Sequence, residues 1–231
     1  LTYDQLVLVL ADGSACRVYA YDKGEGGIWE KALGFSGFVG EKGVSSAKRE
    51  GDKRTPAGIF RLGFAFGSEE TPNPDYPFRA VTQESFWVDD PDSRFYNQWV
   101  EGEAERDWSS AERLANSPTA YALAVVVEYN YGQEAEPGKG SAIFLHVGDE
   151  PTSGCIAGEG GPDGAGAVAG RGRLPAHRHR AGQLGARLPA HGVGEEVLLR
   201  DAPAVPKARH GLALEARARA VQAVPAAEHL L

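Results

Sequence analysis

The stretch Ile143-Phe144-Leu145-His146, followed after four residues by Pro151-Thr152-Ser153-Gly154-Cys155-Ile156, decides how this 231-residue chain is interpreted. The apolar run predicts a strand that ends near His146, and a glycine-containing turn then carries Cys155. A cysteine attacks as its thiolate, and its ordinary pKa of about 8.5 makes a neighbouring imidazole the usual activating base. The spacing therefore predicts that Cys155 is a nucleophile and His146 its base. The alternative is a buried strand histidine near a structural cysteine.

The residues before Cys155 suit an oxyanion site. Gly154 has no side chain, so its turn can direct backbone N–H groups toward a reacting carbonyl. We expect the N–H groups of Gly154 and Cys155 to stabilise the oxyanion of a tetrahedral intermediate. Thr152 and Ser153 are expected to shape the same turn.

Outside this stretch, the pattern predicts a mainly β chain. Asp12-Gly13 between two alternating runs is the strongest hairpin signal, because this pair suits a tight turn. Cys16 lies in the second of these runs and is expected to be a small core residue. The expected strands are residues 5–10, 15–21, 28–33, 57–66, 121–131 and 141–147, with weak helical character over 109–116.

Residues 69–107 are expected to form a long connection interrupted by prolines. Five aromatic side chains are interleaved along it: Phe86, Trp87, Phe95, Tyr96 and Trp99. Such residues either form the floor of a substrate groove or pin the connection onto the core. The sequence leaves both alternatives open.

A second motif gives the chain a family resemblance. Gly51-Asp52-Lys53-Arg54-Thr55-Pro56-Ala57-Gly58-Ile59-Phe60, with Val39-Gly40 and the segment of His146 and Cys155, resembles the L,D-transpeptidase catalytic (YkuD-type) family over residues 6–157. Thr152, Gly154 and Cys155 match the family's turn, whereas Ser153 stands where a second histidine is usual. Ala157 stands where asparagine or arginine is common, which leaves carboxylate recognition by that position in question.

The resemblance implies a β-sandwich or barrel-like fold with short helices and a cysteine acyltransferase that cross-links bacterial peptidoglycan. It implies peptidoglycan stem peptides as substrates, carbapenem-type inhibitors, no cofactor and an extracytoplasmic location. By this resemblance Cys155 forms the thioester and His146 is the base. The alternatives are an L,D-carboxypeptidase, a catalytically impaired wall-binding module and a papain-like or sortase-like cysteine protease.

The last 74 residues differ in composition from the rest. All 21 aromatic residues (9 Phe, 8 Tyr and 4 Trp) lie before residue 158, and the net charge of −8 divides into −11 before that point and +3 after it. We expect a catalytic domain over 1–157 without its C-terminal elements, and an Ala/Gly/Arg/Pro-rich tail over 158–231 that is disordered or translated out of frame. Read one nucleotide later, codons 158–179 permit an amphipathic helix and then a strand.

Composition also excludes several functions. The acidic first part argues against nucleic-acid binding, which requires basic surface. The chain has no apolar run of about 18 residues, so no membrane span is expected. Because it starts at Leu1 and contains no Met, we expect a targeting or anchor segment upstream. His177 and His179 lie in low-complexity sequence, so no metal site is expected there.

Overall fold

A computed structural model describes residues 4–68, 73–159, 164, 167–168 and 195–201. The described chain is mainly β, as the sequence predicts, with three short 3-10 turns and with α-helical residues at positions 164, 167 and 168. The strands are β1 (Gln5–Asp12), β2 (Ala15–Lys23), β3 (Trp29–Phe38), β4 (Val44–Ser45), β5 (Thr55–Pro56), β6 (Gly58–Gly67), β7 (Phe78–Ala80), β8 (Ser85–Val88), β9 (Gln98–Glu101), β10 (Ala111–Arg113), β11 (Ala124–Val127), β12 (Phe144–Val147), β13 (Ile156–Gly158) and β14 (Glu195–Asp201). The 3-10 turns are η1 (Glu25–Gly27), η2 (Leu114–Asn116) and η3 (Gly132–Glu134).

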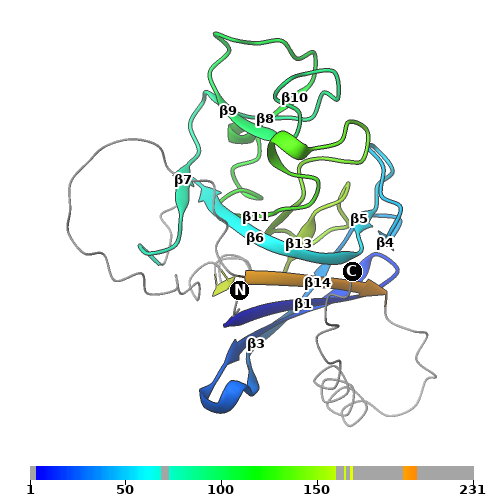
Figure 1. Ribbon diagram of the computed structural model, residues 1–231, viewed down its shortest axis with the longest axis vertical. Coiled ribbons are helices and arrows are strands. Elements are labelled where there is room, and N and C mark those ends of the chain that lie inside the picture. Colours follow the sequence, from blue (N-terminus) through cyan, green and yellow to red (C-terminus); the bar gives the residue numbers. More distant parts are fainter. Residues whose placement is uncertain (1–3, 69–72, 160–163, 165–166, 169–194, 202–231) are drawn as a thin grey trace, which may run out of the picture. The chain divides into compact units, whose positions relative to one another are not determined.

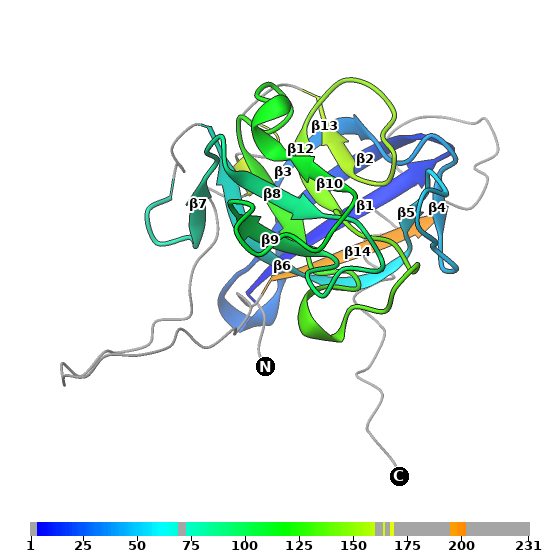
Figure 2. The same ribbon diagram turned by 90° about the horizontal axis from the view of Figure 1, so that it is seen from above.

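The main sheet closes into a barrel. Its strand order is β11-β12-β13-β3-β2-β1-β14-β6-β7, and a further pairing of β11 with β6 joins the two sides, leaving β7 outside the ring. β14 is parallel to β1 and antiparallel to β6, and Figures 1 and 2 both show it, in orange, between these two strands. The barrel-like architecture expected from the sequence is therefore present.

β1 and β2 form the predicted hairpin. Asp12 pairs with Ala15, so the turn has two residues, and Gly13 takes a φ of +62° that glycine adopts without strain. Cys16, on β2, is buried in the core, as expected. The expected strand over 28–33 extends to Phe38, because Gly34 and Gly37 do not interrupt it. A Cβ at Gly37 would lie 2.1 Å from the Ala157 carbonyl oxygen, so this glycine permits close contact with β13.

Residues 69–107 contain more structure than the sequence predicts. β7, β8 and β9 lie within this range, and β8 forms a three-stranded sheet with β9 and β10. The expected helix over 109–116 is wrong: Ala111–Arg113 is a strand, and only Leu114–Asn116 is a 3-10 turn. Glu112 lies opposite Trp87 in this sheet, so pairing with β8 overrides the weak helical preference.

Two apolar clusters occupy opposite faces of the barrel strands. The barrel core contains Val9, Val18, Leu62, Val125, Leu145 and Ile156. The aromatic cluster, between β6, β11 and β12 and the small sheet, contains Phe66, Trp87, Leu114, Tyr121, Val126 and Phe144. Trp87 is 1% exposed, and its ring packs edge-on against Phe144 at 4.8 Å between centroids. Phe86, Trp87 and Tyr96 are buried, which favours the packing role for these aromatic residues over a groove floor.

The structure also bears on two expected strands and on part of the C-terminal tail. The expected strands over 121–131 and 141–147 are shorter, at Ala124–Val127 and Phe144–Val147. Beyond residue 159, Gly164, Ala167 and Val168 are helical, Val168 is buried in the barrel core, and β14 lies in the barrel. The remaining residues of the 158–231 tail, which include most of codons 158–179 of the frameshift hypothesis, lie outside the described residues.

Candidate active site

The pairing of β12 with β13 brings Cys155 and His146 to one face of the barrel. These strands are parallel, with Leu145 opposite Ile156 and His146 opposite Ala157. Cys155 directly precedes Ile156, and side chains alternate between faces along a strand. Leu145 and Ile156 therefore point into the barrel core, whereas His146 and Cys155 point to the aromatic cluster, against which Cys155 packs.

The Cys155 thiol is held in its protonated form. Its Sγ donates to the carbonyl oxygen of Ala142 at 3.2 Å. Burial raises the pKa of the thiol to about 12, and the negative charge of Glu112 acts in the same direction. The Phe144 N–H and the positive charge of Lys48 oppose this rise in pKa. A resting thiol of this kind requires a base to become a nucleophile.

His146 has the protonation state that such a base needs. Its Nδ1 lies 2.8 Å from the carbonyl oxygen of Val147, and a carbonyl only accepts, so Nδ1 carries the proton. The neutral ring then has its lone pair on Nε2. Burial lowers the pKa of His146, which keeps the ring neutral near pH 7. Among the described residues, no hydrogen bond joins Cys155 and His146.

Thr152 organises the nucleophile turn, residues 152–155. Its hydroxyl donates to the carbonyl oxygen of Cys155 at 2.7 Å and accepts from the N–H of Gly154 at 3.1 Å. The Gly154 N–H, expected to serve the oxyanion, would therefore first have to exchange this bond. A Cβ at Gly154 would lie 3.2 Å from Ile143 Cδ1 and 3.3 Å from Arg54 O, so the position is tightly packed. Ser153 is exposed.

Thr55 fixes the same turn from β5. It is fully buried, its hydroxyl donates to the carbonyl oxygen of Cys155 at 3.2 Å, and it accepts from the N–H of Gly40 at 2.8 Å. Gly40 forms a parallel bridge with Thr152, so both threonines connect one small network. Thr55 is part of the motif at residues 51–60, whose role in the site the sequence did not reveal.

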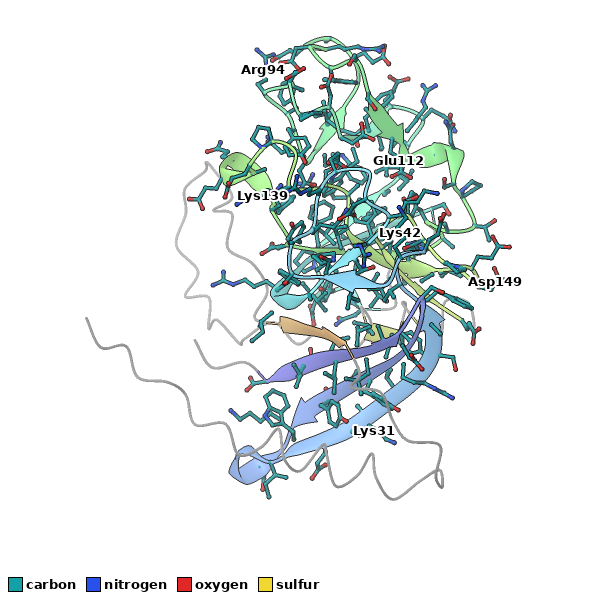
Figure 3. The ribbon with its side chains drawn as sticks, turned by 90° about the vertical axis from the view of Figure 1, so that its right-hand side faces the viewer. Lys31, Lys42, Arg94, Glu112, Lys139 and Asp149 are labelled. Carbon is teal, nitrogen blue, oxygen red and sulfur yellow. The ribbon has the colours of Figure 1, made fainter. Side chains whose placement is uncertain are left out.

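Glu112 and Tyr121 complete the surroundings of the thiol. The Tyr121 hydroxyl donates to Glu112 Oε1 at 2.6 Å, and its ring packs edge-on against His146 at 5.8 Å between centroids. Burial raises the pKa of both Glu112 and Tyr121, and the hydrogen bond from Tyr121 partly opposes the rise at Glu112. Glu112, labelled in Figure 3, comes from β10 of the small sheet. No sequence pattern had indicated either residue.

Other expectations concern metals, membranes and the second cysteine. Within the described ranges, no three His, Cys, Asp or Glu side chains gather as a metal site would require, and His177 and His179 lie outside those ranges. Of the helices that the structure describes, none has the length and apolar character to cross a membrane. Cys16 and Cys155 are both free thiols. Ala157 is buried in β13, opposite Phe38 of β3.

A thiol and a neutral imidazole on one face of two paired strands define a site of the kind that cysteine acyl-transfer enzymes use. A model of the L,D-transpeptidase catalytic domain family (YkuD) matches residues 7–159, and this chain belongs to that family. Members of the family are cysteine transpeptidases that act on the cell wall. Searches of curated proteins and of solved structures found no match.

Proposed function

We propose that this chain is a peptidoglycan L,D-transpeptidase in which Cys155 is the nucleophile and His146 the base. The observation that carries the proposal is the β12–β13 register, since it brings the two side chains to one face. The family match supports the same chemistry. The substrate is a tetrapeptide stem, and its reacting carbonyl belongs to the diamino acid at position 3.

The reaction proceeds in two acyl-transfer steps. The Cys155 thiol turns from Ala142 O to His146 Nε2, gives up its proton, and forms a bond from Sγ to the carbonyl carbon. The C–N bond breaks, D-alanine leaves, and the imidazolium protonates the leaving amine. The amine of a neighbouring stem then attacks the thioester and transfers a proton to His146. The C–S bond breaks, Cys155 recovers its proton, and the stems are cross-linked.

The Cys155 N–H is the oxyanion donor in this proposal, and Gly154 joins it once its bond to Thr152 is exchanged. Two hydroxyls, from Thr152 and Thr55, hold the Cys155 carbonyl and thus restrict the orientation of the peptide groups of the turn. Preorganised donors of this kind reduce the barrier because they need no rearrangement as charge develops. No cofactor takes part.

The partners follow from the reaction. Peptidoglycan stem peptides are the substrates, carbapenem-type β-lactams acylate Cys155 as substrate mimics, and nucleic acid is not a partner. The polymer lies outside the cytoplasmic membrane, so the protein acts extracytoplasmically. If water replaces the acceptor amine, the same site acts as an L,D-carboxypeptidase.

One observation favours a second candidate, a catalytically impaired wall-binding module. The Cys155 thiol is bonded to Ala142 O and has a pKa of about 12, so it is unreactive in its resting position. A module that binds the wall without turnover would keep the thiol in that position. The two candidates differ in whether a substrate can draw the thiol to His146.

Active-site labelling separates the candidates. A carbapenem is incubated with the protein under reducing conditions, and intact-mass spectrometry follows the adduct, with Cys155→Ala as the negative control and Cys16→Ala as the matched cysteine control. A transpeptidase gives one adduct in wild type and in Cys16→Ala, and tetrapeptide muropeptides then yield D-alanine and cross-linked product. A protein that binds peptidoglycan but forms no adduct and releases no D-alanine is the wall-binding module.

A further inference from the structure

Residues 48–55 form a loop directly beside the nucleophile turn. An ion pair and hydrogen bonds within the loop fix its conformation. Lys48 is 6% exposed, and its Nζ donates to Asp52 Oδ1 at 2.7 Å and to the Arg49 carbonyl at 2.7 Å. Asp52 also accepts from the N–H groups of Arg49 at 2.8 Å and Arg54 at 2.9 Å. These hydrogen bonds fix the position of the buried Lys48 ammonium.

The Lys48 side chain reaches both backbone segments that contact Cys155. A Cβ at Gly154 would lie 3.6 Å from Lys48 Cε, so the lysine lies beside the nucleophile turn. A Cβ at Gly140 would lie 3.1 Å from Lys48 Cγ and Cε. Gly140 leads to Ala142, whose carbonyl accepts the thiol. Lys48 therefore lies where the nucleophile turn meets the segment that holds the resting thiol.

We propose that Lys48 is a positioning residue for Cys155, because its methylenes support the backbone at Gly154 and Gly140 and its ammonium, fixed by Asp52, places a buried positive charge beside the nucleophile. The assignment deepens the proposed function, since it rests on Cys155 being the nucleophile. No sequence motif had indicated a role for Lys48.

Charges from several elements act on the thiol. Glu112 from β10 disfavours the thiolate, and Lys48 favours it. The thiolate charge acts on Tyr121, whose ring packs against His146, and the charge of Asp89 acts on Glu112. Glu50 accepts from the hydroxyl of Ser141, the residue before Ala142, at 2.8 Å. Burial is the largest effect on the thiol pKa, and Lys48 opposes it. The charge of Lys48 is therefore expected to increase the thiolate fraction at any given pH.

The test measures the thiolate without requiring turnover. In a Cys16→Ala background, the rate of Cys155 alkylation by iodoacetamide is followed by intact mass from pH 6 to pH 11. Lys48→Met keeps much of the side-chain length but removes the charge, and Lys48→Arg keeps the charge. Asp52→Asn removes the countercharge with little change of shape. Lys53→Met is the matched control, because Lys53 belongs to the same loop but pairs with Glu41 at the exposed surface.

We expect the alkylation profile of Lys48→Met to move to higher pH, with the rate at fixed pH falling about tenfold for each unit of the shift. Asp52→Asn should move it to lower pH, and Lys48→Arg and Lys53→Met should leave it near wild type. Opposite shifts distinguish a charge effect from simple loosening, which would move Lys48→Met and Asp52→Asn the same way.

An unchanged profile in Lys48→Met, or shifts of the same sign in Lys48→Met and Asp52→Asn, would overturn the assignment. If Lys48→Met does not unfold cooperatively, Lys48→Gln, which also removes the charge, takes its place, and the proposal again requires opposite shifts in the lysine variant and in Asp52→Asn. Carbapenem labelling of the same samples tests the proposed function independently. A failure of the Lys48 assignment can therefore be distinguished from a failure of the proposed transpeptidase function.

Discussion

Replacing Thr55 with valine tests how the turn that carries Cys155 is held. The two side chains have nearly the same shape, so the change removes a hydroxyl and leaves little cavity. That hydroxyl accepts from the Gly40 N–H at 2.8 Å and donates to the Cys155 carbonyl at 3.2 Å, and Thr55 is fully buried. The variant therefore loses two hydrogen bonds at once.

The two losses have different costs. The Gly40 N–H is left without its Thr55 acceptor in a buried position, which costs about 1–3 kcal/mol. The Cys155 carbonyl keeps its bond from Thr152 at 2.7 Å, so the loss of the longer bond costs about 0.5–1.5 kcal/mol at most. We expect the free energy of unfolding to fall by about 1.5–4.5 kcal/mol, a large part of the stability of a typical domain.

The assay is urea unfolding of wild type, Thr55→Val and Thr55→Ser, together with the rate of carbapenem acylation. Serine keeps the hydroxyl and loses only a methyl group, so it separates the hydrogen bonds from packing. We expect Thr55→Val to be the less stable variant and the slower to acylate, since its turn is less well fixed. Equal stability and acylation in the two variants would show that the hydroxyl does not hold the turn, and the reasoning would be refuted.

Three further predictions concern the base, an acidic turn and the barrel. His146→Gln should slow acylation by about 10²–10⁴-fold, and its residual rate should rise with pH because attack then depends on the spontaneous thiolate fraction of Cys155; unchanged kinetics at pH 7 would assign another base. Asp90 accepts from the N–H and hydroxyl of Ser109 and from the N–H of Asp92, which lowers its pKa to about 2. Because the folded pKa lies below the unfolded value of about 3.9, Asp90 stabilises the fold above pH 4 and loses this effect as pH falls toward 2. Asp90→Asn should therefore unfold at a lower temperature at pH 7 but differ less from wild type at pH 2.5, and a constant difference across this range would contradict the linkage. Val197→Pro removes an N–H from the middle of β14, between β1 and β6, and should lower the melting temperature; an unchanged value would support a domain that ends at residue 157.

Local patterns were sufficient for much of the barrel. The Asp12-Gly13 turn, the alternating runs beside it and the apolar run ending at His146 are each determined by a few neighbouring residues, so the sequence alone predicts them. β8, β9 and β10 were missed because they are only three or four residues long and form by pairing with one another rather than from a local pattern. Gly34 and Gly37 look like strand breakers in the sequence, yet close packing requires glycine at Gly37.

Some residues of the candidate site could likewise be predicted from the sequence, and others could not. Cys155 and His146 could be predicted because their chemistry and spacing are informative on their own. Thr55 is one hundred residues from Cys155 in sequence, and only the fold shows that its hydroxyl reaches the Cys155 carbonyl. Glu112 lies in a segment with no distinctive pattern, and its effect on the thiol depends on burial. The bond of the resting thiol to Ala142 depends on a backbone at positive φ, +52°, which the sequence does not suggest.

The place of β14 in the barrel sets an order for folding. β1 pairs on one side with its immediate neighbour β2, but its other partner begins at Glu195, 190 residues after Gln5. During synthesis, β1, β2 and β3 can pair as soon as they emerge, whereas one edge of β1 and one edge of β6 remain unpaired until almost the whole chain is available. Contacts over such long sequence separations slow folding, so barrel closure is expected to be the late step. Until then the open edges are the part of the chain most exposed to pairing with another molecule.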